Sequence, residues 1–105
     1  MSTLMLDAAT ATGAGPAFQI RGTNDYYSHR SFQAVGLMSA STGTAVVTIQ
    51  VSNDGVNYVT LGTISLSLTT AASSDAFYLQ TVFEYYRAYV TQITTNGTVS
   101  VYMKA

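Results

Sequence analysis

Cysteine and tryptophan are absent from this sequence, and histidine and proline each occur once. Without cysteine the chain forms neither disulfides nor thiolate metal sites. His29 has no second imidazole or thiol with which to build a metal site or a catalytic triad. We therefore expect no enzyme activity, no bound metal and no cofactor.

Charge is equally scarce, because only 9% of the residues are charged, against about 25% in an average domain. The four basic residues, Arg21, Arg30, Arg87 and Lys104, are scattered along the chain. Nucleic-acid binding needs clustered cations, so we expect no nucleic-acid partner. Low charge favours a surface covered by other subunits, and the alternative is a surface of threonine, serine, asparagine and glutamine.

Long apolar runs are also missing, and no segment approaches the roughly 18 apolar residues of a membrane span. The first 15 residues, "MSTLMLDAATATGAG", have no basic start and no extended apolar stretch, so we expect no ordinary signal peptide. Small residues and two glycines before Pro16 argue against a helix here. We expect residues 1–15 to form an extended arm anchored by Leu4 and Leu6, followed by one domain over residues 16–105.

Alternation of apolar and polar residues with a period of two is the dominant pattern and indicates strands. Seven or eight short strands separated by turn residues predict an all-β fold, namely an antiparallel β-sandwich or jelly-roll-like single domain. A barrel, or an open meander completed by partners, are the alternatives. The expected strands cover residues 16–22, 30–40, 44–52, 57–67, 75–82 and 83–93 and the segment after Gly97.

Two turns have strong local signals. "SNDG" at residues 52–55 predicts a hairpin between 44–52 and 57–67, with Gly55 at a positive φ. The side on which apolar residues fall switches near Gly62, which predicts a bulge or a bend there. Asn96-Gly97 predicts a two-residue hairpin turn that would pair Val90 with Met103.

Eight tyrosines are the most conspicuous residues with polar chemistry. Tyrosine serves in core packing, in protein interfaces and in stacking on sugar rings, and the sequence leaves these three roles open. The aspartates at 25, 54 and 75 stand beside turn residues, which is typical of turn capping rather than of a calcium loop.

"VTIQVSNDGVNYVTLGT" and "FEYYRAYVTQITTNGTVSVYMKA", within residues 44–104, resemble a pattern found in small structural proteins of tailed bacteriophages. The "SNDGVNY" turn is also similar to that of discoidin-type sandwich domains. The phage resemblance implies a non-enzymatic capsid decoration (cement) protein, made in the bacterial cytoplasm. Such a protein binds the outer surface of the major capsid protein in the virion and stabilises the head.

The same resemblance implies a homo-oligomer, with a trimer expected and a dimer as the alternative. Our hypothesis for the protein interface comprises Leu4, Leu6, Tyr26, Tyr27, Arg30, Tyr85 and Arg87. Two rival functions stay open, a carbohydrate-binding module that uses exposed tyrosines and an adaptor of a phage tail or fibre.

Overall fold

The computed structural model describes residues 2–19, 29–80 and 83–104. These residues form nine strands and no helix, and every pairing between strands is antiparallel. The predicted all-β fold is therefore confirmed. The strands are β1 (Ser2–Ala9), β2 (Gly13–Ala14), β3 (Phe18–Gln19), β4 (His29–Met38), β5 (Gly43–Ser52), β6 (Val59–Leu68), β7 (Ser73–Gln80), β8 (Tyr85–Ile93) and β9 (Gly97–Lys104).

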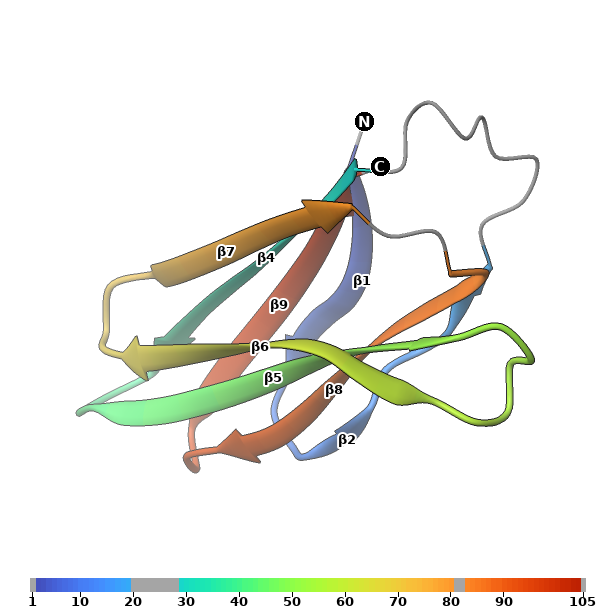
Figure 1. Ribbon diagram of the computed structural model, residues 1–105. Coiled ribbons are helices and arrows are strands. Elements are labelled where there is room, and N and C mark those ends of the chain that lie inside the picture. Colours follow the sequence, from blue (N-terminus) through green and yellow to red (C-terminus); the bar gives the residue numbers. More distant parts are fainter. Residues whose placement is uncertain (1, 20–28, 81–82, 105) are drawn as a thin grey trace.

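The strands form two layers that face each other across one core (Figure 1). One sheet has the order β1-β9-β4-β7. The other has the order β2-β8-β5-β6, with β3 also paired to β8. Only β5 and β6 are consecutive strands that pair with each other, and apart from β2 and β3, which both pair with β8, the chain otherwise changes layer between strands. With β2 and β3 taken as one interrupted strand, this winding is that of a jelly roll.

The core consists of side chains from the inner faces of both sheets. Phe32 of β4 contacts Phe77 of β7 and Tyr86 of β8, with ring centroids 5.3 and 6.0 Å apart. These aromatic rings therefore join the two layers. Alternate residues along four strands are buried: Phe32, Ala34 and Met38 on β4, Ala45, Val47, Ile49 and Val51 on β5, Tyr86, Ala88 and Val90 on β8, and Val99, Val101 and Met103 on β9.

The start of the chain differs from the expected arm. Ser2–Ala9 is strand β1, which pairs with β9 at the edge of its sheet, and Met5 is only 1% exposed. A register shift between Leu4 and Leu6 places Met5 in the core. The small residues correctly predicted an extended chain. An extended chain beside a sheet edge has unpaired backbone N–H and C=O groups, and these gain hydrogen bonds when the chain joins the sheet. The arm is therefore part of the sandwich.

The hairpin predicted at residues 52–55 is confirmed, since β5 and β6 pair along their length and Gly55 has a φ of 76°. The expected irregularity near Gly62 is also present. Ile49 pairs with Gly62 whereas Gln50 pairs with Thr60, so Leu61 is the extra residue of a bulge. Beyond it, Ile64, Leu66 and Leu68 are buried.

The hairpin predicted at Asn96-Gly97 is wrong. β8 pairs with β5, β2 and β3, while β9 pairs with β1 and β4 in the other sheet. The turn is closed by a hydrogen bond from the Gly97 N–H to the Thr94 carbonyl, and Asn96 has a φ of 72°. A two-residue hairpin turn of the expected kind needs positive φ at both central residues. Here Asn96 alone has it, and the chain crosses between layers.

Candidate binding faces

The described residues contain no group of three or more histidine, cysteine, aspartate or glutamate side chains able to hold a metal ion. Nor does any helix among them have the length and apolarity to cross a membrane. The chemistry that the structure offers therefore lies on the outer faces of its two sheets.

The outer face of β4, β7 and β9, together with Leu4 of β1, is called here the pocket face. Its residues alternate with buried ones along β4 and β9, and β7 continues the face through its pairing with β4; Lys104 is the charged member among those whose side chains are described. Leu4 lies opposite Tyr102 on the neighbouring strand. Exposed fractions are 41% for Leu4, 37% for Tyr102 and 75% for Tyr78. Sheets exposing this much apolar surface with so little charge are typical of interaction surfaces.

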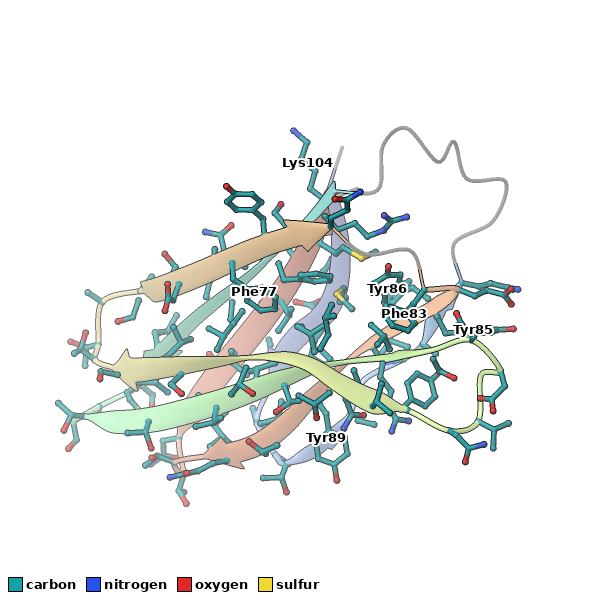
Figure 2. The ribbon with its side chains drawn as sticks, in the orientation of Figure 1. Phe77, Phe83, Tyr85, Tyr86, Tyr89 and Lys104 are labelled. Carbon is teal, nitrogen blue, oxygen red and sulfur yellow. The ribbon has the colours of Figure 1, made fainter. Side chains whose placement is uncertain are left out.

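A depression of about 350 Å³ lies at one end of this face. Cross-strand neighbours form it, because Ser31 pairs with Lys104 and Gln33 pairs with Tyr102. The Lys104 ammonium extends from the end of the sandwich at which the chain termini lie (Figure 2). The depression is lined by Ser31, Gln33, Tyr102, Met103 and Lys104.

The opposite side of the molecule carries a different group of side chains, called here the arginine cluster: Gln50, Tyr58, Arg87 and Tyr89. Arg87 and Tyr89 project outward from β8, because the residues that alternate with them, Tyr86, Ala88 and Val90, are buried. The Arg87 guanidinium carbon lies 3.9 Å from the ring centroid of Tyr58 and 6.0 Å from that of Tyr89. Arg87 Nε donates a 2.7 Å hydrogen bond to Gln50 Oε1 on β5. These contacts hold the guanidinium against the Tyr58 ring and near that of Tyr89.

The two acidic groups of the adjoining turns are engaged with other donors. Asp54 accepts hydrogen bonds from the backbone N–H groups of Val56 and Asn57 and from the Asn57 side chain. Those donors, with the Ser52 hydroxyl, hold the pKa of Asp54 well below its usual range, the Asn57 backbone N–H having the largest effect. Glu84 accepts a hydrogen bond from Gln19 Nε2.

No protein-family model matches the sequence, and no curated protein matches it either. Solved structures do match the fold. One, described as "CBM4 structure and function", has a TM-score of 0.53 at 11% identity, covering 97% of this chain and 64% of that one. The chain thus spans less than two thirds of that protein.

Two further matches have lower scores. The "PBSX exported protein XepA" has a TM-score of 0.48 at 12% identity, covering 98% of this chain and 36% of that one. A "Family 16 Carbohydrate Binding Module-2" has a TM-score of 0.46 at 9% identity, covering 90% and 68%.

The fold is that of a β-sandwich module. At 11% identity the likeness to the first of these structures concerns the fold alone, and one fold serves many functions. What the module does must therefore be argued from its surface.

The candidate interface residues divide between the surface and the interior. Leu4 is exposed on the pocket face, whereas Leu6 is half-buried against the core. Arg30 is only 3% exposed, and its guanidinium lies over the Tyr86 ring at 5.4 Å. Arg30 shares the inward face of β4 with Phe32, which the alternation of the strand should have indicated. The expectation that Arg30 is a surface contact is therefore wrong for this chain.

Tyr85 and Arg87 both project outward from β8 and are half-buried. The Tyr85 ring packs on the turn, since a Cβ placed on Gly55 would lie 3.2 Å from it. Tyr26 and Tyr27 lie outside the described residues. The structure thus brings together two of the predicted residues, Tyr85 and Arg87, at one end of β8.

Sequence reasoning missed the partners of Arg87. Tyr58 and Gln50 are distant from Arg87 in the sequence and reach it because β5 lies between β8 and β6. One signal in the sequence could have indicated Gln50 as a partner: in the alternation of their strands, both Gln50 and Arg87 fall at outward-facing positions. Only the pairing of Gln50 with Arg87 fixes that neighbourhood.

Proposed function

We propose that this chain is a non-enzymatic virion structural protein, a capsid decoration (cement) module of a bacteriophage. It docks on the outer surface of the major capsid protein and stabilises the head. The observation that carries this proposal is the pocket face, on which β4, β7, β9 and Leu4 present apolar and uncharged polar side chains and, among the described side chains, the charged Lys104; the edge strand β1 adds the exposed Asp7.

The composition of the pocket face supports docking against protein. Leu4, Tyr78 and Tyr102 supply exposed apolar and aromatic area, and tyrosine is enriched at protein interfaces. Serine and glutamine side chains between them offer hydrogen bonds without the cost of burying charge. A stable interface covers about 800 Å² on each partner, which is a surface of the size that one sheet of a small sandwich presents.

Stabilisation of the head follows from binding alone. A molecule that binds the assembled shell and not its dissociated subunits shifts the equilibrium toward the shell by mass action. A protein that acts in this way needs no catalytic group, in keeping with the sparse acid–base and metal-binding residues of the sequence.

Docking is tested with heads of the parent phage that lack this chain. Purified protein is added, and bound protein is measured after sedimentation. The double variant Leu4→Ser with Tyr102→Ser is expected to lose most of its occupancy, because both exposed apolar contacts are removed from neighbouring strands. Deleting residues 1–15 is not a suitable test, since it removes β1 and β2 from the sandwich.

Val56→Ser is the matched control, because Val56 is 78% exposed and lies in the turn between β5 and β6, outside the pocket face. It is expected to bind like the wild type. Unchanged occupancy of the double variant, with both proteins folded, would remove the pocket face from the proposal. Labelled protein found on tails instead of heads would favour the adaptor of a tail or fibre.

The oligomeric state is a separate part of the proposal. We expect a homotrimer, with a dimer as the alternative, and the scarcity of charge in the sequence supports coverage by sister chains. Native mass spectrometry of the purified protein measures this directly. A monomer at all accessible concentrations would contradict it.

The carbohydrate-binding alternative draws on a different part of the molecule. Its support is the arginine cluster, which lies on the other sheet and combines two aromatic rings with polar side chains. The two roles use different faces, so that each is tested with its own variants.

A further inference from the structure

We propose that the arginine cluster is a binding site for an acidic saccharide, in which Arg87 binds the carboxylate of the sugar. Tyr58 and Tyr89 would supply aromatic surface beside the sugar ring, and Gln50 an amide donor. The evidence is the placement of the guanidinium, the charges near it and the side chains that surround it.

The Arg87 side chain is held in place before any ligand arrives. Its guanidinium carbon is 3.9 Å from the Tyr58 centroid, and its Nε donates to Gln50 Oε1 at 2.7 Å. Because Nε makes this hydrogen bond, the two outer nitrogens of the guanidinium remain as a planar fork. They can donate two parallel hydrogen bonds to the oxygens of a carboxylate. A side chain already ordered loses less conformational entropy on binding.

The cluster has a positive charge without an internal counter-ion. Within residues 2–19, 29–80 and 83–104, no carboxylate accepts a hydrogen bond from Arg87. Asp54 is held by the donors of its own turn, and Glu84 is bound by Gln19. In a chain with only four basic residues, an ordered guanidinium that has no carboxylate partner among the described residues is a specific place for an anionic group.

The surroundings favour a sugar over an acidic protein segment. Tyrosine combines an apolar ring with a hydroxyl, which suits the mixed apolar and hydroxyl surface of a pyranose. A neighbouring outward position on β8 carries a further amide group, that of the exposed Gln92 beside Val46. Protein interfaces instead have apolar centres, and the pocket face has that character.

This inference does not depend on the proposed capsid role, because the two faces lie on opposite sheets. Figure 2 shows Lys104 and Tyr89 extending from opposite sides of the molecule. Binding of sugars by the isolated chain therefore succeeds or fails independently of binding to heads.

The test is calorimetric titration of the full chain with two acidic probes, trigalacturonate and sialyllactose. Their neutral counterparts are methyl-esterified trigalacturonate and lactose, and triglutamate represents an acidic protein segment. We expect at least one acidic sugar to bind. The affinity for its neutral counterpart and for triglutamate is expected to be lower by about tenfold or more, because only the acidic sugar offers both the carboxylate for Arg87 and the ring for the tyrosines.

Three variants locate the site. Arg87→Gln is expected to weaken acidic sugar binding about tenfold or more, and Arg87→Lys to an intermediate degree, because lysine keeps the charge without the planar fork. Lys104→Gln, which removes a charge from the opposite sheet, is the matched control and is expected to bind like the wild type. Thermal unfolding of each variant establishes that it is folded.

The other outcomes overturn the inference. If neither acidic sugar binds, or if the neutral counterpart binds equally well, Arg87 does not select a sugar carboxylate. Triglutamate binding as tightly as the sugars would assign the cluster to a protein partner. Full affinity in folded Arg87→Gln would place the site elsewhere.

Discussion

The ring of Phe77 lies directly against the backbone of Gly62. A Cβ built on Gly62 would lie 2.6 Å from Cζ of Phe77 and 2.9 Å from its Cε2. Phe77 belongs to an edge strand of one sheet and Gly62 to an edge strand of the other. The contact therefore closes the sandwich along the side where β6 and β7 lie.

Gly62→Ala should destabilise the protein by about 1–3 kcal/mol, because the added methyl group overpacks the site. Urea unfolding measures the change, and Ser65→Ala on the exposed side of the same strand is the control. Combining Gly62→Ala with Phe77→Leu should recover part of the loss caused by Gly62→Ala. Strictly additive effects of the two substitutions would contradict the contact.

Met5→Ala should lower the free energy of unfolding by about 2–5 kcal/mol, because its buried side chain would leave a cavity under β1. Leu4→Ala on the same strand is the control, since Leu4 is largely exposed and should cost much less. Denaturant unfolding distinguishes the two. Equal, small effects would mean that residues 2–9 are a loose arm after all.

Asp54→Asn should reduce the loss of stability at low pH. The pKa of Asp54 is lowered by the Asn57 and Val56 N–H groups in the folded protein, so the unfolded state takes up the proton first as pH falls. The stabilising contribution is therefore complete above about pH 4 and is lost below it. The asparagine keeps an acceptor oxygen and loses the titration.

Urea unfolding of the wild type and Asp54→Asn between about pH 2 and 6, the range in which carboxylates titrate, gives the comparison. The difference in stability between the two proteins should shrink toward the acid end. A difference independent of pH would show that the turn does not depend on the charge of Asp54.

Asn96→Ala should cost about 1 kcal/mol, because alanine lacks the side chain that makes a left-handed conformation tolerable. Asn96→Gly should be nearly neutral at this position. Thermal or urea unfolding measures both. Equal stability of the two variants would argue against a positive φ at residue 96.

The strands and the core were predictable from the sequence, and the partners of several strands were not. Alternation predicted which faces of β5, β8 and β9 are buried, and the "SNDG" turn predicted the pairing of β5 with β6. The Asn96-Gly97 turn signal led to a wrong pairing of Val90 with Met103, with which the alternation of both strands was consistent. Two strands bury alternate residues whether they lie side by side or face each other across a core.

The candidate site was predictable only in part. Arg87 was expected at the surface and is found there, while Arg30 was expected there and is buried over Tyr86. Neither Tyr58 nor Gln50 is close to Arg87 in the sequence. Their contact arises from the order of β8, β5 and β6 in one sheet.

The sequence by itself determined an all-β chain with an apolar core and few groups for chemistry, because side-chain period and composition are local properties. Tertiary structure alone decided that the first residues complete a sheet, that β8 and β9 lie in different layers, and that Arg87 lies over the Tyr58 ring. Those outcomes depend on which strand edges meet, and this is decided by the summed packing of residues far apart in the chain.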